Sequence, residues 1–510
     1  MLVRRSCRFA LALALGAAAC GDDVPSTTSD TEASTGTTSA SSTDGPIATT
    51  DASTTSTTGP MPTTVADESD TGFDPPQAEC GNGFVEDGEQ CDDANADDDD
   101  GCSNACLVPC GIDWEVVTPA PTPDSTSIGM FTAVGADGTV ALVAMQQEVI
   151  ADKRGNLTVF DDVVRVRVHE VTGRERWEQT LSSTDGDLAV QALKVADDGT
   201  VYVATSVPTA DGGKLIRVQA LAAGDGTTQW TADHDGTPGE DDTASGLAIA
   251  PDGDVVVAGR VRAGDGDTDA WLRKLAAADG SEVWTTTYSG TPNNNFSVDI
   301  GGPVTVGADG TVYLLMAEYV DFETRQATLL AYDADGVGPQ WTFAPSLPGS
   351  GQAKDHFPLE VAATDDGGVL MAFTRTIGGE PQFHVYKLDA AGAQEWTLDT
   401  TWLRDRMGRD YELRGIGTHA AGVVLSGRYL NDFESFESSW GEVWLVRLDH
   451  AGNESCRVTY QASARSLLPP SLGPRGAAVG PNEGVFITGE RALEGESAIW
   501  IGRFRPPSEQ

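Results

Sequence analysis

The chain has 510 residues, of which 32 are Lys or Arg and 78 are Asp or Glu, so its formal net charge is −46. A chain of this length holds several small domains or one large repeat domain with attachments. The excess of negative charge argues against nucleic acid and anionic lipid as partners, because their phosphate groups would repel the protein and slow its association.

Residues 1–19 are predicted to be a signal peptide for export. Three arginines supply its cationic region, and a short apolar core follows them. The small residues before Cys20 resemble the cleavage site of bacterial lipoproteins, which implies that Cys20 is diacylated and becomes the mature N-terminus. The three alanines at 17–19 also fit ordinary signal cleavage. We expect an exported protein that is anchored to the outer membrane, periplasmic or at the cell surface.

Residues 20–79 are predicted to be a disordered linker. Ser and Thr make up about half of residues 24–72, and large apolar side chains are almost absent there. Such a segment cannot bury enough surface to offset the entropy that it would lose on ordering. A flexible coil of this length spans roughly 45 Å, so the linker would hold the rest of the chain away from a membrane.

Residues 80–110 are predicted to form a small disulfide-rich module. An even number of cysteines in an exported protein favours disulfides over free thiols or zinc. Six cysteines remain outside the signal peptide and the lipid site: Cys80, Cys91, Cys102, Cys106, Cys110 and Cys456.

The frame CGNGFVEDGEQCDD, which starts at Cys80, and the later GCSNAC, which ends at Cys106, resemble the Myxococcus cysteine-rich repeat of exported proteins. This resemblance implies two disulfides among the first four of the six cysteines. It indicates the location of the protein more than an activity.

Clustered carboxylates in two loops make a structural Ca²⁺ an open alternative, although we predict no cofactor. The first loop does not fit an EF-hand, because Ala96 and Leu107 stand where the first and last ligands belong. In both loops the other interpretation is a solvated acidic segment. The aspartates concerned are Asp92, Asp93, Asp97, Asp98, Asp99 and Asp100 in the first loop and Asp265, Asp267 and Asp269 in the second.

A glycine turn followed by a short apolar strand recurs seven times in residues 111–510. The turn glycines, 54 to 62 residues apart, are Gly138, Gly199, Gly253, Gly310, Gly367, Gly422 and Gly484. In five copies a tryptophan follows in step: Trp177, Trp230, Trp284, Trp341 and Trp396. Cys456 takes its place in the sixth copy, the seventh copy ends without this strand, and Trp114 precedes the first copy.

This arithmetic predicts an all-β, seven-bladed β-propeller over residues 111–510. A unit of about 57 residues is long enough for four antiparallel strands, and strands that are apolar on both faces suit sheets that pack face to face around an axis. The strand of Trp114 would complete the seventh blade, so that both chain ends close the ring. A solenoid is the alternative, but it would need caps rather than a missing strand balanced by an extra one.

The two cysteines near the predicted closure suggest a further disulfide. A Cys110–Cys456 bridge would join the closing strand to the outer strand of blade six. On the chain-entropy model so long a loop is worth roughly 4–5 kcal/mol. Pairing of Cys110 within the small module is the alternative.

The hairpin TGRERW, which ends at Trp177, resembles the repeats of PQQ-like propellers. Gly226, Gly280 and Gly392 keep the Gly-x-x-x-Trp spacing of that motif. The quinone dehydrogenases with these repeats have eight blades and adjacent cysteines, whereas this chain has seven predicted blades and no adjacent cysteine pair. The resemblance therefore implies the branch that serves as assembly or binding scaffolds, with the tryptophans as blade-packing residues.

Sequence templates for catalysis are absent. There is no G-x-S-x-G, no H-E-x-x-H and no P-loop, and we find no repeated position that carries charged or metal-binding groups. The six histidines are scattered, and we expect them to be surface or turn residues. We assign no catalytic residue.

We therefore predict a monomeric, non-catalytic scaffold at the cell envelope. It would bind an envelope or extracellular protein or a glycan, and would contact the membrane only through its lipid anchor. The alternative is a quinone- or metal-dependent enzyme, an oxidoreductase or a carbohydrate-active protein, with its site in the propeller channel.

Overall fold

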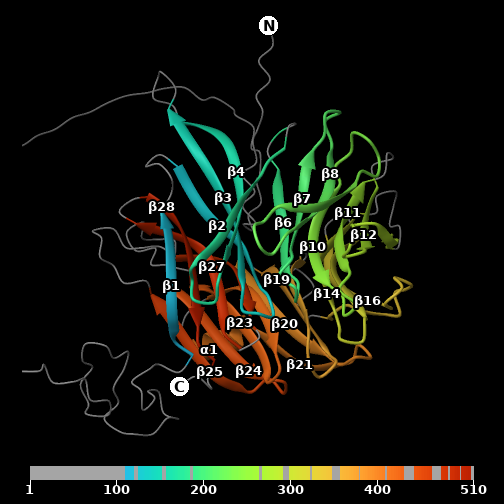
Figure 1. Ribbon diagram of the computed structural model, residues 1–510. Coiled ribbons are helices and arrows are strands. Elements are labelled where there is room, and N and C mark those ends of the chain that lie inside the picture. The colour runs from blue at the N-terminus through green and yellow to red at the C-terminus, as the bar shows by residue number, and fades with distance from the viewer. Residues whose placement is uncertain are drawn as a thin grey trace, which may run out of the picture. The chain divides into compact units, whose positions relative to one another are not determined.

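A computed structural model shows seven four-stranded antiparallel sheets, arranged as the blades of a propeller (Figure 1). The predicted all-β fold with seven blades is thus confirmed. The structure describes residues 110–119, 125–151, 157–183, 186, 188–262, 267–290, 298–321, 324–346, 356–377, 380–407, 411–429, 442–461, 472–480, 483–493 and 496–506.

Blades one to three follow each other along the chain. Blade one consists of β2 (Ser125–Val134), β3 (Val140–Ala151), β4 (Leu157–His169) and β5 (Glu175–Leu181). Blade two consists of β6 (Ala189–Val195), β7 (Val201–Pro208), β8 (Lys214–Leu221) and β9 (Thr228–His234). Blade three consists of β10 (Thr243–Ile249), β11 (Val255–Arg262), β12 (Thr268–Leu275) and β13 (Glu282–Tyr288).

Blades four to six repeat this order. Blade four consists of β14 (Asp299–Val306), β15 (Val312–Asp321), β16 (Thr324–Tyr332) and β17 (Trp341–Phe343). Blade five consists of β18 (His356–Ala363), β19 (Val369–Ile377), β20 (Glu380–Leu388) and β21 (Gln394–Asp399), and a short helix, α1 (Thr400–Met407), follows it. Blade six consists of β22 (Tyr411–His419), β23 (Gly422–Tyr429), β24 (Glu442–Asp449) and β25 (Glu454–Gln461).

Blade seven is built from both ends of the propeller. Its strands run in the order β26 (Leu472–Val479), β27 (Val485–Leu493), β28 (Glu496–Phe504) and then β1 (Ile112–Pro119). Figure 1 shows β1, in blue, beside the red strands of the C-terminal end. The prediction that the strand of Trp114 completes the last blade is therefore confirmed.

The ring is closed, because the first strand of each blade contacts the first strand of the next blade all the way round. Apolar side chains fill the space between neighbouring blades, so the core is a circle of interfaces rather than one central cluster. Within the described ranges, no helix has the length and apolar character needed to cross a bilayer.

The Asp-Gly turns between first and second strands explain the repeated motif. In blades one to five the turn glycine has φ between 79° and 88°, a conformation that glycine adopts without steric cost. The residue before it is an aspartate whose carboxylate accepts a hydrogen bond from the backbone N–H two residues later, at 2.8 to 3.3 Å. Blade seven differs from the expected pattern, because Glu483, rather than Gly484, has the positive φ there.

Five tryptophans, one on the outer strand of each of blades one to five, join their blade to the next one. Each indole N–H donates to a backbone carbonyl in the last hairpin of the following blade, at 2.9 to 3.2 Å. The ring also packs on the turn glycine of that hairpin: a Cβ on Gly226 would lie 2.6 Å from Trp177, and one on Gly280 would lie 2.6 Å from Trp230. We call this contact the tryptophan–glycine dock.

Candidate functional site

The ring has two edges with different connections. We call the edge with the glycine turns the turn edge. The opposite edge, which holds the connections from second to third strand and from blade to blade, is the loop edge. Loops at the edge of a rigid scaffold are where binding residues concentrate.

An arginine lies between two aromatic rings at the loop edge of blades four and five. The guanidinium carbon of Arg325, on β16, is 4.3 Å from the ring centroid of Phe357 and 5.4 Å from that of Tyr319. Tyr319, on β15, is the direct cross-strand partner of Arg325, and Phe357 comes from β18 of the next blade. All three side chains are half-buried. Arg and aromatic residues in such a setting are typical of the energetically important residues of protein interfaces.

A buried aromatic layer supports this cluster from blade five. His356, next to Phe357, accepts a hydrogen bond on Nδ1 from the Ala327 N–H of blade four, at 3.3 Å. Its ring packs on Phe373, and His384 stacks on the same Phe373 at 5.4 Å. Burial, together with the nearby Arg375 cation, lowers the pKa of His384 to about 4, so this ring is neutral at pH 7. The expectation that the histidines lie at the surface or in turns is wrong for these two, which are 8% and 5% exposed, and for His169 of blade one, which is 2% exposed.

Two buried aspartates fasten loops at the same edge. Asp242, just before β10, accepts hydrogen bonds from the N–H groups of Gly236 and Arg262 at 2.6 and 3.0 Å. Asp299, at the start of β14, accepts one from the Gly290 N–H at 2.5 Å. The Asp242 carboxylate therefore holds the connection before β10 in place, and the Asp299 carboxylate binds the backbone at Gly290, just after β13.

A charged pair from opposite parts of the ring lies on the first strands. Lys194 is on β6 and Glu360 is on β18. Burial raises the pKa of the Glu360 carboxyl, and the positive charge of Lys194 opposes that rise.

Among the residues that the structure describes, no three His, Cys, Asp or Glu side chains gather in a group able to hold a metal ion.

One repeated charged position was missed from the sequence. At the turn edge, the residue of the third strand that pairs with the tryptophan position is a cation in four blades: Lys274, Lys387, Arg447 and Arg503. The signal was present as a Lys or Arg followed by Leu or Phe before each last hairpin. The two lysines each bind an aspartate of a glycine turn: Lys274 Nζ is 2.5 Å from Asp252, and Lys387 Nζ bonds Asp366 and is also 2.6 Å from Glu395 on β21.

The structure places some of the predicted site residues and not others. Cys110 and Cys456 form a disulfide, which is one of the two pairings considered for Cys110. Asp267 accepts a hydrogen bond from the Thr268 N–H, and Asp269 lies on β12. The following predicted residues lie outside the described ranges: Cys20, Cys80, Cys91, Cys102, Cys106, Asp92, Asp93, Asp97, Asp98, Asp99, Asp100 and Asp265.

Several solved structures are similar to this chain at low identity. The quinohemoprotein alcohol dehydrogenase from Comamonas testosteroni is 12% identical, with a TM-score of 0.40 and coverage of 77% of this chain and 76% of that chain. The polysaccharide lyase Uly1 is 10% identical, with a TM-score of 0.44 and coverage of 78% and 99%. The β-propeller domain of the Trilobed protease from Pyrococcus furiosus is 10% identical, with a TM-score of 0.42 and coverage of 74% and 95%.

A protein-family model covers blades one to four and the first two strands of blade five. No curated protein matches the chain. The model described as outer membrane protein assembly factor BamB matches residues 114–381, which is more than half of the sequence. The match begins at Trp114 in the closing strand and ends within β20. The chain therefore belongs to the family described as outer membrane protein assembly factor BamB.

Proposed function

We propose that this protein is a non-catalytic scaffold that binds another protein of the cell envelope through the Arg325 cluster, which consists of Tyr319, Arg325 and Phe357. The observation that carries the proposal is the arginine held between two half-buried rings on strands of two rigid blades. Such a group presents little flexibility, so little entropy is lost when a partner covers it. The family is described as an assembly factor, which agrees with a binding role.

The rest of the chain fits export to the envelope. In this proposal residues 1–19 direct export, Cys20 carries the lipid, and residues 20–79 give the propeller reach from the membrane. The cysteine-rich module of residues 80–110 would lie between this linker and the propeller. With a net charge of −46, the protein would attract partners with basic surfaces, and salt would slow that association.

The first prediction uses a photo-cross-linking residue in place of Tyr319 in the full-length protein in cells. We expect a cross-linked adduct with a defined protein, because Tyr319 lies beside Arg325 at the proposed contact. A second variant carries the same probe together with Arg325→Ala. It should form at least about 90% less of this adduct, since one central arginine often contributes about 2 kcal/mol to an interface. Adducts are identified by mass spectrometry.

The control places the same probe at Val283, which is 50% exposed on the outer strand of blade three, away from the cluster. Equal adducts at both positions, or an adduct that survives Arg325→Ala in a protein with unchanged thermal stability, would overturn the proposed contact. An adduct with a glycan would identify the other class of ligand. Thermal unfolding with Ca²⁺ and with Ca²⁺ plus PQQ tests the enzymatic alternative: stabilisation of about 2.7 kcal/mol at 100 times the Kd that requires PQQ would make this an oxidoreductase.

A further inference from the structure

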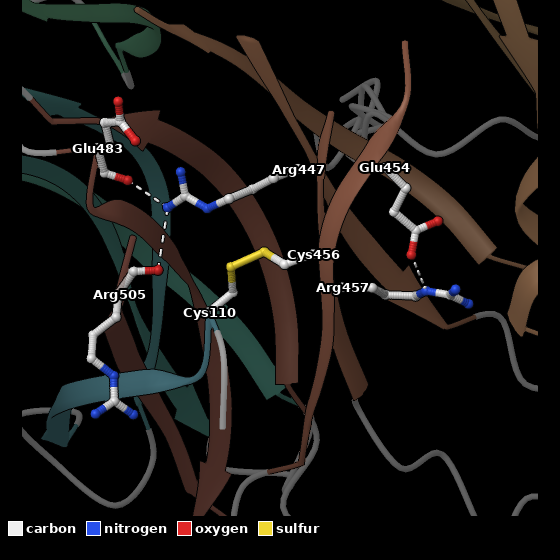
Figure 2. The surroundings of a disulfide bond; sticks show 7 residues. All are labelled: Cys110, Arg447, Glu454, Cys456, Arg457, Glu483 and Arg505. Carbon is white, nitrogen blue, oxygen red and sulfur yellow. Dashed lines mark hydrogen bonds and ion pairs between the residues drawn. A yellow bond between two sulfur atoms is a disulfide. The ribbon is translucent and has the colours of Figure 1, made fainter. Parts of the chain in front are cut away.

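Six of the seven blade junctions are held by the tryptophan–glycine dock, and one is not. The tryptophan of each outer strand packs on a turn glycine of the next blade, and the last pair closes the ring from Trp114 on β1 to Gly173 in blade one. The junctions with a dock pair Trp177 with Gly226, Trp230 with Gly280, Trp284 with Gly336, Trp341 with Gly392, Trp396 with Gly452 and Trp114 with Gly173. The remaining junction, from blade six to blade seven, contains the disulfide Cys110–Cys456 (Figure 2).

Cys456 lies at the tryptophan position of blade six. In blade five, Trp396 pairs across the sheet with Lys387, and in blade three Trp284 pairs with Lys274. Cys456 pairs with Arg447 in the same register, next to the same kind of strand irregularity. The cysteine therefore replaces the tryptophan without any shift of the outer strand.

Cys110 lies at the turn-glycine position of blade seven. The six turn glycines of the dock have φ between 72° and 84°, and Cys110 has φ 59°, a left-handed conformation that is uncommon for a residue with a Cβ. In each hairpin the residue after the glycine accepts a backbone hydrogen bond that closes the turn, as Val337 does from Asp333. At the seam Gly111, the residue after Cys110, accepts the same bond from Arg505 at 2.9 Å.

The two ends of the propeller thus imitate a hairpin that is cut inside its turn. In this register the carbonyl acceptor of the dock would belong to Pro506, and the break in the chain lies between that residue and Cys110. A cut turn cannot hold its two strands together by chain connectivity. Arg447 adds to the junction, because its buried guanidinium donates to the carbonyls of Glu483 and Arg505 (Figure 2).

We propose that the Cys110–Cys456 disulfide is the covalent counterpart of the tryptophan–glycine dock, and that the propeller closes fully only after this bond has formed. Closure is then a redox step. The two thiols lose two electrons and two protons to form one S–S bond, while a disulfide oxidant of the exported compartment is reduced to two thiols. Closure also waits for the whole propeller to be made, since the two cysteines are 346 residues apart.

The geometry predicts that a dock can replace the disulfide only if both positions change together, with glycine at 110 and tryptophan at 456. In four docks a Cβ at the turn position would lie 2.6 to 2.8 Å from the tryptophan ring, and in the docks of Trp396 and Trp114 it would lie 3.3 and 3.4 Å away, so a tryptophan favours glycine opposite it. The test therefore compares three variants of the full-length protein with wild type: Cys110→Ala with Cys456→Ala, Cys110→Gly with Cys456→Trp, and Cys110→Ala with Cys456→Trp. Thermal unfolding and amide hydrogen exchange of β1 and β28 are measured.

We expect the Ala/Ala variant to unfold roughly 5 °C or more below wild type and to lose exchange protection first in β1 and β28. The Gly/Trp variant should recover at least half of that shift, and reductant should leave its seam strands protected. The Ala/Trp variant keeps a Cβ under the ring and should recover none. A Gly/Trp variant that is as unstable as Ala/Ala or fails to fold, or an Ala/Ala variant as stable and protected as wild type, would overturn the proposal.

Discussion

His384 shows how one position in a blade sets the chemistry of a side chain. It lies on β20, directly across from Phe373 on one side and Asp399 on the other. Burial and the cation of Arg375 lower its pKa from 6.5 to about 4, while Asp399 opposes the shift and His356 adds to it. The folded protein therefore holds this imidazole in its neutral form, with its ring stacked on Phe373.

This environment predicts a loss of stability in mild acid. A folded pKa below the unfolded value gives a contribution that is present above pH 6.5 and is lost as the pH falls towards 4. Between pH 7 and pH 5 the loss from this group is about 2 kcal/mol. His384→Gln should therefore lose less stability than wild type over this range, as measured by urea unfolding at each pH.

His169, in blade one, provides a second site for the same measurement. Burial and the nearby Arg167 lower its pKa to about 4 as well. His169→Gln should therefore reduce the loss of stability between pH 7 and pH 5 by a similar amount. Identical slopes in wild type and both variants would show that these rings do not titrate as the folded environment predicts.

The tryptophan–glycine dock is the unit that repeats at the scale of elements. It joins the outer strand of one blade to the last hairpin of the next, and combines a hydrogen bond to a carbonyl with packing of the indole on the turn. Glycine at the turn serves two purposes, because the backbone has positive φ and the ring occupies the space of a side chain. The glycines of the last hairpins are therefore harder to replace than other turn glycines, because both the backbone conformation and the tryptophan ring exclude a side chain.

A matched pair of glycines in blade three separates these two purposes. Gly253 and Gly280 have φ 88° and 72°, but a Cβ would meet nothing within 4 Å at Gly253 and the Trp230 ring at 2.6 Å at Gly280. We expect Gly253→Ala to cost about 1–2 kcal/mol for the left-handed backbone alone. Gly280→Ala should cost roughly 1–3 kcal/mol more for overpacking. Equal costs in chemical denaturation would contradict the dock.

At the scale of the whole molecule, the propeller depends on β1 to close its last blade. Trp500 and Phe504 of β28 are fully buried, and β1 pairs with this strand along its length. Glu115 of β1 accepts hydrogen bonds from the Trp500 indole at 2.7 Å and from the Tyr460 hydroxyl of blade six at 2.8 Å. One short segment therefore ties together blades six and seven.

Truncation measures this dependence. A chain that starts at residue 110 keeps β1, whereas one that starts at residue 120 exposes the edge of β28 and the side chains that β1 covers. We expect the shorter chain to unfold roughly 10 °C or more below the longer one and to associate through the open edge. Calorimetry and gel filtration test both effects, and equal behaviour of the two chains would show that blade seven is stable with three strands.

The sequence by itself determined the number of blades and the way in which the ring closes. Apolar strands, Asp-Gly turns and a tryptophan at a fixed spacing are local signals that each blade repeats, and repetition makes a weak signal readable. Departures from this regular repeat predicted how the ring closes: the missing last strand, the early Trp114 and the cysteine pair Cys110 and Cys456.

Apart from the Cys110–Cys456 bridge, the tertiary structure alone decided which side chains meet across blades. Arg325 and Tyr319 are near in sequence, but Phe357 belongs to the next blade, and nothing in the repeat indicates that its ring lies over the guanidinium. The cations of the third strands were missed because their partners lie on other turns and strands, and the buried histidines because burial depends on the neighbouring sheet. Periodicity specifies the backbone of each blade, whereas contacts between blades depend on how the sheets are rotated and stacked around the axis, which no local pattern encodes.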